Sequence, residues 1–255
     1  MRIVYLIFIL LSFSMLSMAE EQKNWTQINV YGFAVGIEGT TKLRGVESDV
    51  DASFSDILEN LDLGGMVFVE HRRGKWSFMA DGLFMKLSAE DSPSTNGILE
   101  VDLEVDILQA LVEAFIGYRV LEQHYQRSAL GIDLFGGARY NYIKLELDVS
   151  ASGLGLTRSS LREADEDWVD GVIGIRFQYD HDNGWGASFW ADIGEGSDSS
   201  SYQLIGLVNY SLTSNIRVFG GYRYYQMDYE TGSGSNTFEL DLDYSGPMVG
   251  VGYRF

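Results

Sequence analysis

Cysteine is absent from this 255-residue chain, and proline and histidine are scarce, with 2 and 3 residues. Without cysteine, neither a disulfide framework nor a thiolate metal site can form. Beyond the N-terminus, no segment approaches the roughly 18 consecutive apolar residues that a transmembrane helix needs. Basic residues are in the minority, because 18 lysines and arginines face 37 acidic residues and leave a net charge of −19. This acidity argues against a nucleic-acid partner.

The first nineteen residues have the pattern of a secretory signal peptide. Arg2 is their only charge, an apolar run covers residues 3–11, and Ser17 and Ala19 supply small residues at the −3 and −1 positions of a cleavage site. A transmembrane helix is the alternative, but the apolar run is short for a bilayer of about 30 Å, and acidic residues follow it directly. We therefore expect an exported protein with residues 20–255 as its mature domain.

Glycine and aromatic residues are abundant, with 29 Gly, 15 Tyr and 14 Phe, which is typical of many strands joined by tight turns. Apolar residues alternate with polar ones in repeated segments, as in strands that separate lipid from a lumen. The sequence thus predicts an all-β fold, a transmembrane antiparallel up-and-down β-barrel of ten strands, with eight as the alternative. The predicted strands cover residues 28–38, 64–72, 75–88, 98–120, 128–149, 167–180, 185–194, 201–212, 216–230 and 237–255.

Short and long connections alternate along the chain. In outer-membrane barrels the short turns face the periplasm and the longer loops face outside. Phe54, Ile57, Leu58 and Leu61 recur at helical spacing and predict a short helix in the first long loop, with Ser53 or Ser55 as its N-cap. The short turns are predicted at 73–74, 122–128, 181–184 and 213–215, and the longer polar segments at 40–62, 89–97, 150–166, 195–200 and 232–236.

The end of the chain carries the most specific pattern. Val249, Val251, Tyr253 and Phe255 share one face of the last predicted strand. A terminal aromatic residue preceded by alternating apolar residues resembles the signal that the barrel-assembly machinery reads in outer-membrane proteins. We expect this strand to serve as the assembly signal.

Six acidic and six basic residues occupy the alternate strand positions whose side chains are predicted to face the lumen. A barrel of this size is just wide enough for side chains to fill it, and buried charges are tolerated when they are paired and hydrogen-bonded. A closed, salt-bridged core is therefore the favoured interpretation; a selective ion path, the alternative, would show an excess of one sign or a wider bore. The predicted lumen charges are Glu70, Arg72, Asp81, Glu113, Arg119, Asp133, Arg139, Asp170, Arg176, Asp192, Arg223 and Arg254.

Toward the predicted outer rim, the alternation inverts on five strands. The alternate residues that would face lipid nearer the short turns become charged toward this rim. The residues between them, which would face the lumen, become apolar. This inversion predicts strands that continue above the outer leaflet around an apolar interior; loose loops are the alternative. The sequence leaves open whether that interior is packed or a pocket. The charged residues are Lys86, Asp102, Glu104, Asp106, Lys144, Glu146, Asp148, Asp228, Glu230, Glu239, Asp241 and Asp243, although a bulge near Pro247 would change the register of the last strand.

Catalytic and metal sites are not indicated. His71, His124 and His181 lie in or beside predicted periplasmic turns, far from a site at the outer face. Residues 161–168, LREADEDW, form an acidic segment that lacks the spacing of a calcium loop, and a solvated surface is favoured over cation binding. The sequence implies no cofactor. It allows divalent cations at the acidic outer rim, where they would bridge to lipopolysaccharide.

Residues 53–88, SFSDILENLDLGGMVFVEHRRGKWSFMADGLFMKLS, and 246–255, GPMVGVGYRF, suggest a family. The chain resembles small Gram-negative outer-membrane β-barrel proteins described as porin-like and is similar to the barrel of the OmpA and OmpX group. The resemblance implies a structural, adhesive or narrow-pore protein in outer-membrane lipid and lipopolysaccharide, with no catalytic residue. The expected role is structural or surface-interacting. A narrow channel for small or hydrophobic solutes is the first alternative, and a lipid-modifying enzyme the second.

Overall fold

The computed structural model describes residues 24–43, 46–91, 94–95, 99–153, 156–234 and 237–255. The predicted signal peptide, residues 1–19, lies outside the described residues and stays a prediction. Side chains are described for fewer residues, and those of Asp102, Glu104 and Asp148 are not among them.

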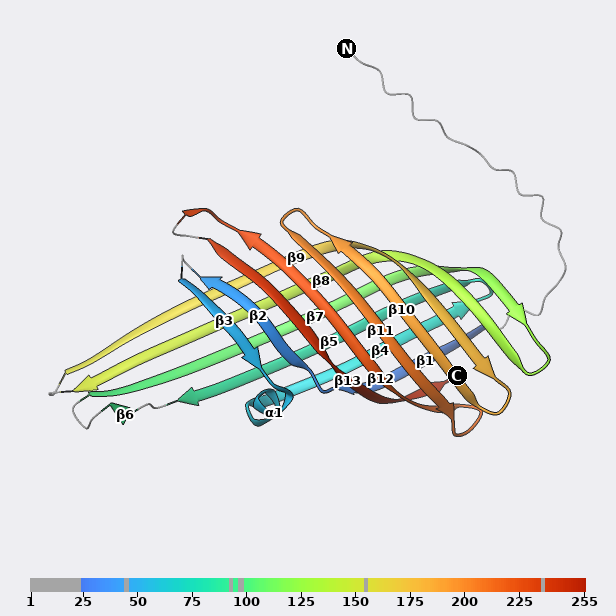
Figure 1. The fold of residues 1–255 in the computed structure, drawn as a ribbon, viewed down its shortest axis with the longest axis horizontal. Coiled ribbons are helices and arrows are strands. Elements are labelled where there is room, and N and C mark those ends of the chain that lie inside the picture. Colours follow the sequence, from blue (N-terminus) through green and yellow to red (C-terminus); the bar gives the residue numbers. More distant parts are fainter. Residues whose placement is uncertain (1–23, 44–45, 92–93, 96–98, 154–155, 235–236) are drawn as a thin grey trace, which may run out of the picture.

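Ten antiparallel strands close into a barrel, so the predicted fold is confirmed and the eight-stranded alternative is wrong (Figure 1). β1 pairs with both the second and the last of these strands, and Val30 lies opposite Val67 on one side and Val251 on the other. Around the wall the strands are β1 (Asn24–Phe33), β4 (Leu61–Arg73), β5 (Trp76–Asp91), β7 (Leu99–His124), β8 (Ser128–Gly153), β9 (Leu156–His181), β10 (Trp185–Glu195), β11 (Ser199–Ser211), β12 (Ile216–Thr231) and β13 (Phe238–Arg254).

The four short turns lie together at one end of the barrel, the short-turn end. They follow β4, β7, β9 and β11, and the start of β1 lies there too, because Gln27 pairs with Arg254. Gly74 and Gly184 occupy two of these turns with φ angles of 58° and 91°, which residues with a side chain rarely adopt. The clustering of short turns at one end agrees with the prediction.

The predicted strand 28–38 is interrupted at Ala34 and Val35, so this part of the prediction is wrong. The Ala34 amide donates to the carbonyl oxygen of Pro247 at 2.9 Å, and a Cβ on Gly246 would collide with the Ala34 carbonyl. Because Gly246 has no side chain, the backbone at Ala34 can pass close to β13 at this point. Beyond the break, β2 (Gly36–Leu43) continues along β13, and β3 (Val46–Ala52) folds back on β2. Within the predicted polar loop, 40–62, these two strands occupy residues 40–43 and 46–52.

The helix predicted in this region is confirmed as α1 (Phe54–Glu59). Ser53 is its N-cap, and the Ser53 hydroxyl and the Asp56 carboxylate form a capping box with each other's backbone amides. The hydrogen bonds from Ser53 lower the pKa of Asp56. Among the described residues, no helix is long and apolar enough to cross a bilayer.

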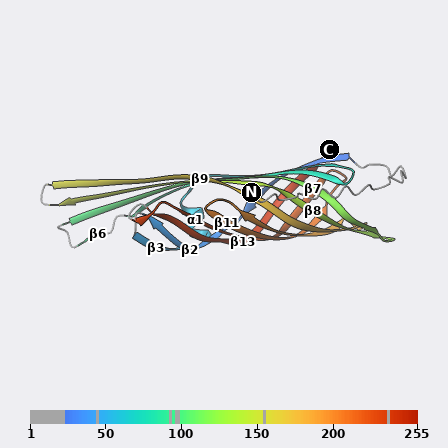
Figure 2. The ribbon, with the colours of Figure 1, turned by 90° about the horizontal axis from the view of Figure 1, so that it is seen from above.

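β7, β8 and β9 are 26 residues long, more than twice the roughly ten that a strand needs to cross a bilayer. β8 and β9 pair with each other without a break up to Gly153 and Leu156. The prediction of a loop over residues 150–166 is therefore wrong. Figure 2 shows these three strands, with the short β6 (Ser94–Thr95) beside them, extending beyond the other strands of the wall. Residues 89–97, another predicted loop, are partly strand and partly outside the described residues.

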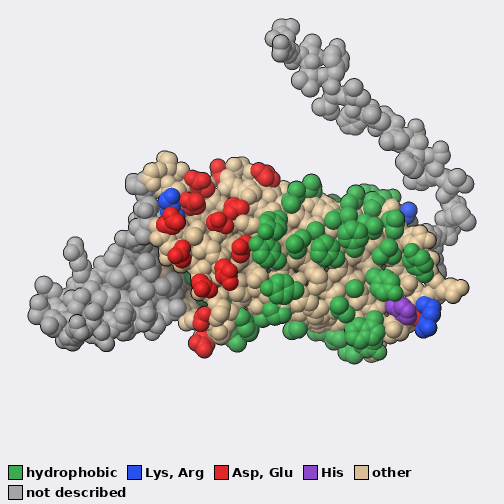
Figure 3. Space-filling model, in the orientation of Figure 1, with side chains coloured by type: hydrophobic (Ala, Val, Ile, Leu, Met, Phe, Trp, Pro, Cys, Tyr) green, Lys and Arg blue, Asp and Glu red, His purple; other side chains and the backbone are tan. Residues whose placement is uncertain are grey.

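Exposed apolar side chains form a band on the part of the barrel nearer the short-turn end, where Figure 3 shows them in green. Along β9, Val169, Ile173 and Phe177 are exposed, whereas Val172 and Arg176 between them are buried. Aromatic pairs border the band. Trp76 packs on Tyr118 and Trp185 on Tyr210 toward the short turns, and Tyr202 packs on Tyr224 at the other border. Two aromatic girdles of this kind mark the interfaces of a transmembrane barrel.

Candidate functional site: a closed, charged lumen

In the part of the lumen nearer the short-turn end, which we call the lower lumen, three arginines surround two carboxylates. Arg176 binds both oxygens of Glu70, at 2.8 and 2.9 Å, and donates to Asp133 at 2.7 Å. Arg72 donates to the same Asp133 oxygen at 2.7 Å, and Arg119 also binds Asp133. Bidentate arginine–carboxylate contacts are the strongest ion pairs that proteins use. We call these five residues the lower cluster.

A second cluster lies nearer the middle of the barrel. Arg139 contributes Nε to Glu113 and Nη2 to Asp192, each at 2.6 Å, and its guanidinium lies 4.9 Å from the ring of Tyr225. Arg223 lies 3.3 Å from Asp81 and 3.6 Å from Glu113. Arg139, Arg223, Glu113, Asp81 and Asp192 form the middle cluster, and none of them is more than 8% exposed.

Two of the twelve predicted lumen charges have no ion-pair partner among the described residues. Asp170 is fully buried and accepts hydrogen bonds from the hydroxyls of Ser199 and Ser201. Arg254 donates to Gln27 and lies 4.1 Å over the ring of Trp25. The structure therefore brings ten of the twelve together in two clusters.

Uncharged side chains complete these clusters and were missed from the sequence. The Tyr31 hydroxyl donates to Asp81 at 2.8 Å, Gln203 donates to Asp192 at 3.0 Å, and Ser201 accepts from Arg139 at 2.9 Å. All three have the inward parity of their strands, so the signal that finds the charges would also have found them. Buried charges need such partners, because each lone pair or proton left unsatisfied is costly.

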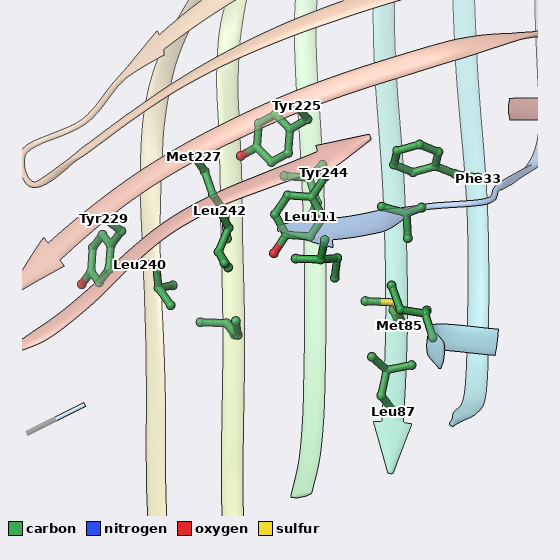
Figure 4. Packing of buried hydrophobic residues seen from close by; sticks show 14 of the residues in the cluster. Phe33, Met85, Leu87, Leu111, Tyr225, Met227, Tyr229, Leu240, Leu242 and Tyr244 are labelled. Carbon is green, nitrogen blue, oxygen red and sulfur yellow. The ribbon is translucent and has the colours of Figure 1, made fainter. Parts of the chain in front are cut away.

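An apolar cluster packs the lumen above the charges (Figure 4). Met227, Leu240 and Leu242 are at most 4% exposed, and Trp168 stacks on Tyr229 with ring centroids 4.2 Å apart. Ile57 places α1 against the same cluster. A cavity of about 20 Å³ lies between Phe33, Met66, Met85 and their neighbours. The upper interior is thus packed along its described part, which answers the question that the alternation left open.

Acidic side chains cover the outside of the strands at this level, and Figure 3 shows them in red beside the apolar band. Asp228 lies directly opposite Asp241 on the outer face of β12 and β13, with Glu230 opposite Glu239 one step further. Partial burial raises the pKa of Asp228, and the Asp241 carboxylate raises it further. The pairing is regular through Pro247, so no bulge changes the register. At this level of β12 and β13 the outward-facing residues are therefore acidic and the inward-facing residues apolar, as the inverted alternation predicted.

The acidic segment 161–168 is strand rather than loop, which corrects the prediction. Glu163, Asp165 and Asp167 point outward along β9, and Lys144 of β8 lies 3.0 Å from Glu163. Glu166 accepts a hydrogen bond from the Tyr229 hydroxyl. Among the described residues, no group of three or more His, Asp or Glu is arranged to hold a metal ion.

The three histidines lie at the short-turn end. His71 Nδ1 is 2.9 Å from the Thr26 hydroxyl, His124 is 3.2 Å from Glu122, and His181 is 3.0 Å from Asp182. None of these carboxylates belongs to the lumen clusters.

The predicted assembly residues lie on the apolar band. Val249, Val251, Tyr253 and Phe255 are between 46 and 69% exposed, so this face of β13 lies on the surface rather than in the lumen. The Phe255 amide donates to the carbonyl oxygen of Thr26, which joins the end of the chain to the first strand.

Comparison with known proteins rests on structure alone. No protein-family model matches the chain, and no curated protein matches its sequence. The fold is similar to the outer membrane protease OmpT from Escherichia coli, with a TM-score of 0.53 and 11% identity over 95% of this chain and 100% of that one. Ail of Yersinia pestis aligns with a TM-score of 0.35 at 14% identity over 91% and 99%, and Neisserial surface protein A with 0.31 at 12% over 92% and 100%.

Of these three, OmpT alone aligns with a TM-score above 0.5, and at this identity the likeness shows the fold and nothing of the activity. The ten-stranded closed wall, the apolar band and this likeness agree. The chain has the fold of an outer-membrane β-barrel.

Proposed function

We propose that the protein is a closed integral barrel of the Gram-negative outer membrane, with a structural or surface-interacting role. One observation carries the proposal: the lumen is filled at two levels, by the ion-pair clusters and by the apolar cluster above them. A barrel with such an interior offers no wide path for solutes. We further propose that the protein is not an enzyme.

The long strands support a role at the cell surface. With the short turns in the periplasm, β7, β8 and β9 would stand well above the outer leaflet. Their acidic outer faces would meet the headgroups of lipopolysaccharide, with divalent cations bridging the carboxylates to the lipid phosphates. The barrel-assembly machinery would recognise the last strand, with Val249 to Phe255 as its signal.

Recordings in planar lipid bilayers test the closed lumen against the channel alternative. The purified, folded chain is expected to insert without producing a sustained open state, because a solute would have to displace both the apolar cluster and the ion pairs. Insertion is verified separately by protease protection of the barrel. A stable, ohmic open state from inserted wild-type protein would contradict the proposal and favour the narrow channel.

A further inference from the structure

A cavity of about 140 Å³ lies in the lower lumen, beside the lower cluster. Trp25, Gln27 and Arg254 line it at the short-turn end, and Asp81 and Glu113 line it at mid-height. An engineered protein cavity of about 150 Å³ holds benzene, so this one has room for a single aromatic ring. Nothing in the proposed closed role requires such a space.

Aromatic and aliphatic side chains supply much of the wall. Phe68 and Trp190 meet edge to face with ring centroids 6.0 Å apart, and Phe219, Leu207 and Met248 complete the apolar part. Aromatic rings pack favourably in offset and edge-to-face arrangements. The wall therefore suits a flat apolar body.

Three buried polar atoms on this wall lack a hydrogen-bond partner among the described residues. They are Trp190 Nε1, Gln203 Oε1 and Asn209 Oδ1. Gln203 is only 1% exposed, and its amide nitrogen already donates to Asp192. Buried groups of this kind are normally satisfied, and all three side chains line the cavity, so a polar group bound in the cavity is a candidate partner for them. The apolar wall is thus combined with a few directed polar groups, as in sites for small molecules.

The charges on the wall favour an anion at the mouth. Glu70, Glu113 and Asp180 each have an arginine within 3.4 Å. Arg254 has no acidic partner within 4.0 Å among the described residues, and Arg217 lies at the same end with Asp180 as its only counter-ion. Asn209 is two residues before Ser211, which pairs with Arg217. The wall therefore carries Arg254 and Arg217 at the opening of the cavity, and Asn209, whose side-chain oxygen can accept a hydrogen bond, two residues further inside.

We propose that this cavity binds a small aromatic carboxylate with a second polar group, which enters from the short-turn end. The carboxylate pairs with Arg254 and Arg217, the ring lies between Phe219, Trp190 and their apolar neighbours, and a hydroxyl or amino group donates to Asn209. Binding of this kind is compatible with a closed barrel, because the part of the apolar cluster around Met227, Leu240 and Leu242 does not line the cavity. The inference goes beyond the proposed function and does not depend on it.

Titration of the folded full-length chain with 4-hydroxybenzoate, followed by ligand-observed NMR, tests the proposal. Wild-type protein should bind saturably, with a Kd of about 1 mM or tighter. Arg254→Gln should weaken binding by at least about tenfold, because a charge-assisted pair is lost. Ser188→Phe, which fills the cavity from β10, should abolish binding. Folding of each variant is verified by its heat-modifiable migration on a gel.

Arg127→Gln is the matched control, because Arg127 is an arginine near the same end that lies outside the cavity and pairs with Asp182. It should bind like wild type. Non-saturable binding, equal losses in Arg127→Gln and Arg254→Gln, or equal affinity for the neutral 4-hydroxybenzyl alcohol would each overturn the proposal. The cavity would then hold water only.

Discussion

Arg139→Met is expected to destabilise the folded barrel by about 3–5 kcal/mol, the usual cost of removing one partner from a buried ion pair. Arg139 is fully buried and is shared by Glu113 and Asp192, which are themselves 2% and 4% exposed. Its removal takes from Asp192 its arginine partner and leaves Glu113 with Arg223, 3.6 Å away, so the middle cluster loses one of its two positive charges. The urea midpoint of the chain refolded into lipid vesicles measures the loss.

Two comparisons separate this effect from simple loss of packing. Combining Arg139→Met with Glu113→Gln and Asp192→Asn removes the uncompensated charges and should restore much of the stability. Lys144→Gln breaks an ion pair on the solvated outer face of β8 and should change the midpoint little, because exposed pairs contribute weakly. If Arg139→Met and Lys144→Gln unfold at the same urea concentration, the charges of the middle cluster are as well solvated as those of the outer face, and the account of a closed, ion-paired interior is wrong.

Ile173→Arg is expected to cost about 2–4 kcal/mol, as charged residues do on the lipid face at the middle of a bilayer. Ile173 is 65% exposed and lies midway along the apolar part of β9, between Val169 and Phe177. An arginine there must either strip its charge of water or thin the bilayer around it. The same refolding titration in vesicles gives the free energy of unfolding.

Ile173→Ala controls for the loss of the apolar side chain, and Glu163→Arg places the same charge on the same face of β9 beyond the apolar band. Both should fall well short of the effect of Ile173→Arg. Equal destabilisation by Ile173→Arg and Glu163→Arg would mean that lipid does not cover residue 173.

Period-two alternation predicted the strands of the wall because one face meets lipid and the other a packed lumen. Where this contrast exists, as along Val169 to Phe177, a single residue of slippage would exchange the two faces, so the register could be read from the sequence. The same rule found the inward face for Arg139 and Asp192. The helix was also predictable, because its apolar residues recur at helical spacing directly after Ser53, which is its N-cap.

This alternation is missing from part of the two longest paired strands. Residues 150–166 are polar and lack a continuous alternation, so they were assigned to a loop, although β8 reaches Gly153 and β9 begins at Leu156. The break at Ala34 was hidden for another reason. It depends on the close approach of Ala34 to Gly246, more than two hundred residues away in the sequence.

The alternation along a strand predicts which face each side chain lies on, but it does not predict which residue the side chain contacts. Asp170 lies directly opposite Arg139 on the neighbouring strand, yet Arg139 reaches Glu113 and Asp192 while Asp170 is held by two serines. The choice depends on how far each side chain extends across the lumen. It therefore required the three-dimensional arrangement.

Cysteine labelling along β9 tests most directly whether lipid surrounds a sealed interior, since the chain has no native cysteine. The single variants are Ile173→Cys, Val172→Cys and Glu163→Cys, in protein folded into vesicles. A maleimide on an acyl chain should label position 173, a charged water-soluble maleimide should label position 163, and neither should label position 172. Labelling of positions 172 and 173 by the water-soluble reagent at similar rates would contradict the account.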